Sequence, residues 1–96
     1  MRCVFSPLAE LDLEEIGDYI ARDNPPRAVS FIREIREQCA KITAMPLGAP
    51  SRHELGEGIR MVPFGHYLIF YTADAESIRI ERVLHGARNI PVSFDA

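Results

Sequence analysis

The first quarter of the chain has the pattern of a short strand followed by an amphipathic helix. Residues 2–6 form a brief apolar run, which predicts the strand. Ser6-Pro7 predicts the helix start, because a serine side chain accepts an unbonded backbone N–H and proline is tolerated in the first helical position. The helix is expected to end near Asp23-Asn24, just before two prolines. One apolar stripe at helical spacing runs along it, formed by Leu8, Leu11, Ile16, Tyr19 and Ile20.

A second amphipathic helix is predicted from about Pro26 to Ala44. The turn before it is short and contains proline, so the two helices are expected to form a hairpin. Neither helix can bury an apolar stripe on its own, and the hairpin therefore needs a further layer to pack against. The stripe of the second helix consists of Ala28, Phe31, Ile32, Ile35, Cys39 and Ile42.

The second half of the chain changes from helical to strand periodicity. Residues 45–58 are predicted to be a loop, because prolines and a glycine interrupt its first part and the remainder is polar. Strands are predicted at residues 59–63, 66–72 and 77–84. The turns between them are too short for parallel crossovers, so these strands should form an antiparallel meander. We predict a two-layer α+β fold of order β-α-α-β-β-β, with the position of the first strand in the sheet left open.

Composition and charge narrow the possible partners. The chain has 96 residues, enough for one domain at 1–96, and 47% of them are hydrophobic. The net charge is −3, whereas proteins that bind nucleic acid through its phosphates usually carry basic excess, so direct nucleic-acid binding is not expected. No apolar run approaches the roughly 18 residues of a membrane helix. The first apolar run stops at Ser6-Pro7, too early for a signal-peptide core, so the cytoplasm is the expected compartment.

No spacing typical of a cofactor or metal site occurs in the sequence. The two cysteines, Cys3 and Cys39, lack the spacing of metal ligands, and a reducing compartment disfavours a disulfide between them. Cys39 falls on the apolar side of the second helix and is expected to be a small buried hydrophobic residue. Phosphate-binding glycine loops and nucleophile–base pairs at known spacing are also missing. We therefore expect no metal, no organic cofactor and no catalytic residues.

The whole pattern resembles the ParE branch of the RelE/ParE superfamily of bacterial toxins. The resemblance extends from roughly Val4 to Arg88, and it rests on several segments in a fixed order rather than on one motif. These segments are Ser6-Pro7-Leu8-Ala9, Asp12-Leu13-Glu14-Glu15-Ile16, Asp18-Tyr19-Ile20, Asn24-Pro25, the helix Ala28 to Ile42, Met45-Pro46-Leu47-Gly48, Gly58 to Val62, Tyr67 to Tyr71 and Ile80 to Arg88.

This resemblance implies the toxin half of a type II toxin–antitoxin pair. ParE-type toxins are associated with inhibition of DNA gyrase by protein binding, and a ParD-like antitoxin neutralises them by wrapping the toxin. A toxin–antitoxin hetero-oligomer is the expected assembly. The related RelE branch instead cleaves messenger RNA on the ribosome, and a third alternative is an inactive toxin that only binds its antitoxin.

The residues fit the ribonuclease branch poorly. Cleavage of RNA without a metal needs a base, an acid and cations that stabilise the phosphorane. Tyr67 stands where that branch has an arginine, and Phe94 aligns with its tail tyrosine, although a phenyl ring has no hydroxyl to transfer a proton. His66 and His85 remain alternatives as acid and base, because histidine titrates near neutral pH. The other interpretation is that His85 caps the end of a strand.

Six residues are predicted to bind a partner. The only concentrated basic group consists of Arg60, Arg79, Arg82 and Arg88, helped by His85. It is predicted to bind carboxylates or phosphates, and the alternative is that it pairs with Glu76, Glu81 and the acidic first helix. Arg82 shares the alternation phase of Ile78 and Ile80, so it should point inward to a structural partner. The predicted partner-binding residues are Arg60, Tyr67, Arg79, His85, Arg88 and Phe94.

Both faces of the central strand are apolar, which predicts cover on each side. Tyr67, Ile69 and Tyr71 share one face, and the other is formed by His66, Leu68 and Phe70. One face should pack on the helical hairpin. The other is either covered by the tail of the chain or exposed as a binding surface. We expect the tail and the antitoxin to cover it together.

Overall fold

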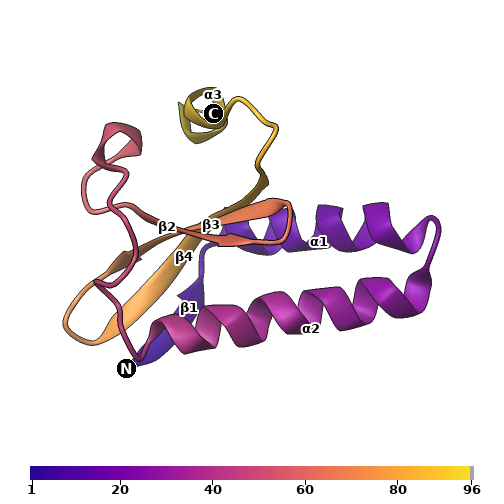
Figure 1. Cartoon of the computed structure of the whole chain (residues 1–96), viewed down its shortest axis with the longest axis horizontal. Helices are drawn as coiled ribbons and strands as arrows, with labels where there is room; N and C mark the ends of the chain where they lie inside the picture. The colour runs from indigo at the N-terminus through magenta and orange to yellow at the C-terminus, as the bar shows by residue number, and fades with distance from the viewer. Residues whose placement is uncertain (96) are drawn as a thin grey trace.

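The computed structural model describes residues 1–95 and confirms the predicted order of elements (Figure 1). The tail adds a short helix to that order. The elements are β1 (Arg2–Phe5), α1 (Pro7–Ala21), α2 (Pro25–Ile42), a 3-10 turn η1 (His53–Leu55), β2 (Arg60–Phe64), β3 (Tyr67–Ala73), β4 (Ser77–His85) and α3 (Ile90–Asp95).

The four strands form one mixed sheet in the order β1-β4-β3-β2. Strands β2, β3 and β4 form the predicted antiparallel meander. Strand β1 lies parallel to β4, with a register that runs from Arg2 opposite Ser77 to Phe5 opposite Ile80. The first strand is therefore an edge strand beside the last one, a placement that the sequence pattern left open.

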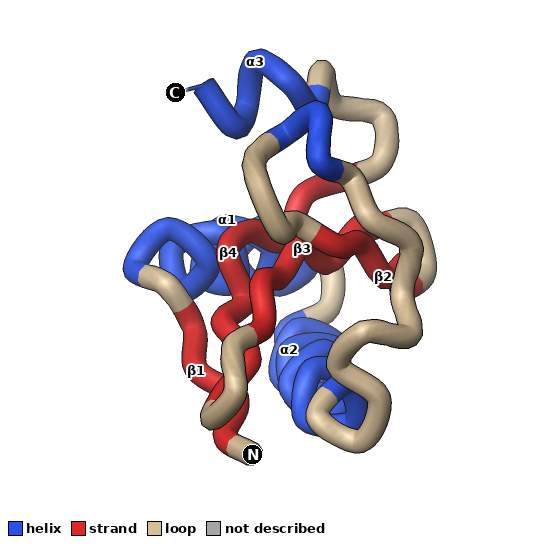
Figure 2. Tube along the Cα trace, turned by 90° about the vertical axis from the view of Figure 1, so that its left-hand side faces the viewer, coloured by secondary structure: helices blue, strands red, loops and turns tan. Residues whose placement is uncertain are grey.

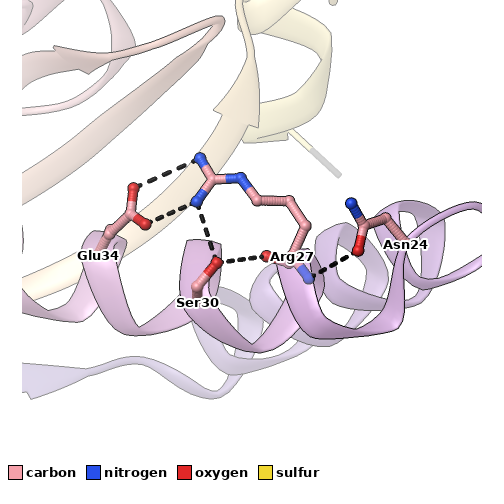
Figure 3. A network of polar contacts seen from close by, with 4 residues as sticks. All are labelled: Asn24, Arg27, Ser30 and Glu34. Carbon is pink, nitrogen blue, oxygen red and sulfur yellow. Dashed lines mark hydrogen bonds and ion pairs between the residues drawn. The ribbon is translucent and has the colours of Figure 1, made fainter.

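Both long helices begin at side-chain caps. The Ser6 hydroxyl accepts the backbone N–H of Ala9 at 3.0 Å, as predicted. Asn24 caps α2 by accepting the N–H of Arg27 at 3.1 Å, so α2 begins at Pro25, one residue before the predicted start. Figure 3 shows that the Arg27 guanidinium donates to both Ser30 and Glu34. These groups are exposed, and the ion pair therefore adds little to stability beyond the cap itself.

The helices α1 and α2 pack on one face of the sheet, and α3 lies on the other (Figures 1 and 2). The stripe predicted for α2 is confirmed, since Phe31 and Ile32 are half-buried and its other members are buried. Ile35 and Cys39 have no exposed surface and contact the sheet core. The turn between the helices projects beyond the sheet, so the far end of the hairpin has a helix partner but no sheet beneath it (Figure 1).

The single stripe predicted for α1 is wrong. Ile16 is buried and Ile20 half-buried, whereas Leu8, Leu11 and Tyr19 are 49%, 54% and 65% exposed. Ala9 and Leu13 complete the buried side instead. The reason is the rotation between successive residues of a helix. At about 100° per residue around the axis, the exposed and the buried apolar residues lie on different sides of α1. Helix α1 thus has one apolar side in the core and a second at its surface.

A second cluster of apolar side chains covers the other face of the sheet. Phe70 and Leu84 are buried there beneath Ile59 and Ile90. Phe94 of the tail helix packs edge-to-face on Phe70, with ring centroids 4.9 Å apart. The prediction that the tail of the chain covers this face is therefore confirmed. Residues of the 53–59 segment supply the rest of the cover, so an antitoxin is not needed to bury this face.

A β-bulge in β4 changes the phase on which the prediction for Arg82 relied. Phe70 pairs with Arg82 while Tyr71 pairs with Ile80, which leaves Glu81 as the extra residue. After the bulge, Val83 takes the position toward the helices that strict alternation assigns to Arg82. The prediction that Arg82 shares the phase of Ile80 is therefore wrong. The prediction of a structural partner holds, because Arg82 forms an ion pair with Asp12.

The two thiols should differ sharply in reactivity. Burial raises the pKa of Cys39 to about 12, so only about one molecule in 10⁴ carries its thiolate at pH 8. Cys3 is half-buried, and burial raises its pKa as well. We expect a disulfide reagent such as Ellman's reagent to modify native protein slowly at Cys3, and at Cys39 only after denaturation. A native Cys3→Ser variant that still reacts at the rate of the parent would contradict this expectation.

Candidate partner-binding site

Two grooves lie beside α1 on the side of β4. The first, of about 480 Å³, lies between the start of α1, the sheet and the tail. The second, of about 290 Å³, lies beside the second half of α1 and the end of β4. The first groove is lined by Ser6, Pro7, Leu8, Glu57, Ile59, Thr72, Arg79, Glu81, Arg82 and Phe94. The second groove is lined by Asp12, Glu15, Ile16, Tyr19, Tyr67, Val83, His85 and Arg88.

The structure brings five of the predicted partner-binding residues to these grooves. Arg79 and Phe94 line the first groove, where Arg79 forms an exposed ion pair with Glu81. Tyr67, His85 and Arg88 line the second. These residues come from β3, β4 and the tail, and only folding places them together.

Arg60 lies apart from both grooves. Its guanidinium donates to the backbone carbonyl oxygens of Leu47 and Ala49, at 3.3 and 2.7 Å. The phenol of Tyr71 donates to a third carbonyl of the same loop, at Pro46. Arg60 therefore holds the loop after α2 against the sheet in this structure, and its predicted role toward a partner remains a prediction.

The second groove is aromatic and polar. The rings of Tyr67 and His85 meet edge-to-face with centroids 5.3 Å apart, and the His66 ring stacks on His85 at 6.2 Å. Burial, and then the nearby Tyr19 phenol, raise the pKa of Tyr67, so its hydroxyl stays protonated at neutral pH. The His85 Nδ1 accepts the backbone N–H of Ala87 at 3.1 Å, which is the capping role considered for it. Tyrosine and histidine in this arrangement offer apolar area together with hydrogen-bonding groups.

A buried ion pair separates the two grooves. Asp12 is 5% exposed and holds the Arg82 guanidinium through two hydrogen bonds, Nε to Oδ2 at 2.8 Å and Nη2 to Oδ1 at 2.9 Å. The same Oδ2 accepts the backbone N–H of Val83 at 2.9 Å. The carboxylate raises the pKa of Arg82, which stays charged. Because β1 pairs with β4 only as far as Ile80, Asp12 takes the place of a neighbouring strand along the next part of β4.

Sequence reasoning missed the contribution of α1 to these grooves. Leu8, Glu15 and Tyr19 line them, and Leu11 is exposed on the same side of the helix. A signal was available, because these four positions fall within a narrow angular range of a helical wheel, on a different side from Ala9, Leu13 and Ile16.

Metal-binding clusters and membrane-spanning helices are both missing from the described part of the chain. Within residues 1–95, no three histidine, cysteine or acidic side chains lie close enough together to hold a metal ion. Among the described helices, none is both long and apolar enough to cross a membrane.

Comparison with known proteins identifies the family. Residues 3–90 match the family described as ParE toxin of type II toxin-antitoxin system, parDE. The chain is 30% identical over 91 residues to Toxin ParE1 from two strains of Mycobacterium tuberculosis, CDC 1551 / Oshkosh and H37Rv, and the match covers 93% of each protein. The same fold occurs in a chain of the chromosomal ParDE TA system from P. aeruginosa, with a TM-score of 0.77 and 19% identity over 88% of this chain and 95% of that one. With this match over nearly its whole length, the chain belongs to the ParE toxin family of type II toxin–antitoxin systems.

Proposed function

We propose that this toxin inhibits DNA gyrase by binding it, and that a ParD-like antitoxin neutralises the toxin in a hetero-oligomeric complex in the cytoplasm. The observation that most strongly supports the proposal is the family match over residues 3–90. The structural relative from P. aeruginosa belongs to a ParDE system, which supports an antitoxin as partner. No metal or organic cofactor takes part in the proposed mechanism.

The chemistry of the grooves favours binding over RNA cleavage. The second groove is lined by charged groups of both signs, with Asp12 and Glu15 on α1 and Arg88 after β4. The Arg82 charge is already neutralised by Asp12. A phosphate chain would meet carboxylates there without a surplus of cations, whereas a protein surface can present groups of either sign. The protonated Tyr67 phenol is also a poor general base at neutral pH.

Supercoiling by purified gyrase tests the proposal directly. We expect the toxin to inhibit supercoiling, and we expect messenger RNA in a translating extract to stay intact. His85→Gln keeps a hydrogen-bonding side chain and should leave the inhibition within about threefold of the parent, because binding does not depend on proton transfer. Loss of a general acid or base would instead reduce a cleavage rate by about 10²–10⁴.

Three outcomes separate the alternatives. Cleaved RNA together with a large loss of toxicity in folded His85→Gln would contradict the gyrase proposal and support a ribonuclease. A toxin that neither inhibits gyrase nor cleaves RNA, yet co-purifies with its antitoxin, would be an inactive member of the family. Inhibition of gyrase with intact RNA would support the proposal.

A further inference from the structure

A groove of about 450 Å³ lies between α1 and α2, apart from the two grooves beside β4. Its floor is apolar, because Leu13 is buried, Ile32 is half-buried and Gly17 has no side chain. A methyl group added at Gly17 would lie 3.6 Å from Ile32 Cγ1, so the two helices approach each other closely here. Its rims consist of the exposed side chains of Glu10, Glu14, Asp18 and Arg36. This hairpin groove therefore opens to solvent, on the face of the hairpin that is turned away from the sheet (Figure 1).

The two helices of the hairpin have opposite net charge. Helix α1 carries five acidic and no basic side chains, whereas α2 carries four basic and two acidic ones. The ion pair between Glu10 and Arg36 joins the two helices. Glu14 and Asp18 on α1 and Arg33 on α2 are exposed, and they form no ion pair with the described side chains. The face thus presents uncompensated charges of both signs on two adjacent helices.

The contacts between the helices fix which residues lie at the same height along the hairpin. Glu10 pairs with Arg36, and Gly17 lies beside Ile32. Glu14 lies between these two contacts on α1, and Arg33 lies between them on α2, so Glu14 and Arg33 are at about the same height. Val29 is about one turn further along α2, close to the height of Gly17, and its side chain is 68% exposed.

A two-fold axis parallel to the helices makes this face complementary to itself. Rotation about such an axis places α1 of one copy over α2 of the other and leaves the height of every residue unchanged. Arg33 of each copy then meets Glu14 of the other copy. Val29 of each copy meets the hairpin groove of the other copy beside Gly17. The acidic helix of one copy thus lies over the basic helix of the other at both contacts.

We propose that two copies of the toxin associate through this face, hairpin against hairpin, as a two-fold symmetric dimer. Two reciprocal ion pairs between Arg33 and Glu14 and two Val29 side chains in the hairpin grooves hold the copies together. Exposed ion pairs contribute little each, so the dimer is weak and reversible. The inference goes beyond the proposed function, because neither the gyrase target nor the antitoxin enters it.

Sedimentation equilibrium of the full-length toxin tests the inference. We expect a reversible equilibrium between monomer and dimer at protein concentrations between about 1 µM and 1 mM, where weak complexes dissociate. Glu14→Arg and Arg33→Glu should each weaken the dimer at least about tenfold, because each substitution places like charges opposite one another at both contacts. Val29→Asp should weaken it as well, since it places a carboxylate over an apolar floor.

Glu76→Arg is the matched control for Glu14→Arg. Glu76 is exposed in the turn between β3 and β4 and forms no ion pair with the described side chains. The substitution makes the same change in net charge away from the hairpin, so it should change the dimer affinity by less than about twofold. Circular dichroism of each variant establishes that the fold is retained.

An equimolar mixture of the two charge variants is the sharpest measurement. In a dimer of one Glu14→Arg chain and one Arg33→Glu chain, both contacts again join opposite charges. The mixture should therefore recover the dimer to within about threefold of the parent affinity, although each variant alone stays largely monomeric. Recovery in the mixture also shows that neither substitution has damaged the fold.

Several outcomes would overturn the inference. They are a toxin that is monomeric at every concentration, a dimer that the charge variants leave intact, a mixture that stays monomeric, and equal effects of Glu76→Arg and Glu14→Arg. The last of these would mean that net charge governs the association and not this face. None of these measurements uses gyrase or an antitoxin, so the proposed function stands or fails separately.

Discussion

Replacing Asp12 with alanine is expected to destabilise the protein by about 3–5 kcal/mol. The substitution removes the ion pair and both hydrogen bonds that Asp12 forms with the Arg82 guanidinium, whose side chain is 13% exposed. It also leaves the Val83 N–H without an acceptor at the edge of the sheet. A domain of this size has a free energy of unfolding of about 5–14 kcal/mol, so the substitution would remove a large part of it. Denaturant unfolding measures the difference.

Glu10→Ala is the matched control for Asp12→Ala. It removes an acidic residue of the same helix that also pairs with an arginine, but the pair between Glu10 and Arg36 is nearly half exposed. Its loss should therefore cost less than about 1 kcal/mol. If both substitutions have the same small effect, the bonds of Asp12 to β4 do not hold α1 in place. A partial recovery of stability in Asp12→Leu combined with Arg82→Leu would show that the broken ion pair between these two residues causes the loss.

Replacing Ile35 with alanine is expected to cost about 2–5 kcal/mol. Ile35 has no exposed surface and lies in the centre of the core between α2 and the sheet. Truncation removes buried methyl and methylene groups and leaves a cavity that the close-packed neighbours fill only in part.

Val29 offers a comparison on the same helix. Its side chain is 68% exposed, so Val29→Ala should change the free energy of unfolding by less than about 0.5 kcal/mol. A loss below about 1 kcal/mol in Ile35→Ala would mean that the core tolerates the cavity and that α2 is less tightly packed on the sheet than the structure indicates.

The two helices differ in how well the sequence predicts their burial. In α2 the apolar residues lie on one side, so periodicity identifies the core-facing side, including Ile35 and Cys39. Helix α1 has apolar residues on two sides, and the spacing of Leu11 and Tyr19 is as helical as that of Ile16. Periodicity shows that residues share a helix, but only tertiary packing decides which apolar side meets the sheet.

The two grooves depend on structural features that the alternation of apolar and polar residues along a strand does not predict. The bulge at Glu81 reverses the phase of the strand, so strict alternation gives the wrong side for Arg82 and Val83. Residue chemistry and family resemblance nevertheless identified five of the groove residues, among them Tyr67, His85 and Arg88, whose side chains are suited to binding. Arg60 has the same chemistry and lies elsewhere, since its donors meet loop carbonyl oxygens that no sequence pattern places beside it.

The parallel pairing of β1 with β4 has a consequence for synthesis of the toxin in the cell. Residues 2–5 find their partner strand only at residues 77–80, so the loop between them spans most of the chain. Closing such a loop costs entropy that local contacts cannot offset, and the sheet is completed late in folding. A nascent chain can form the helical hairpin early, but its core remains open until residues 77–80 have been synthesised and have left the ribosome. We therefore expect the grooves beside β4 to be assembled later than the hairpin.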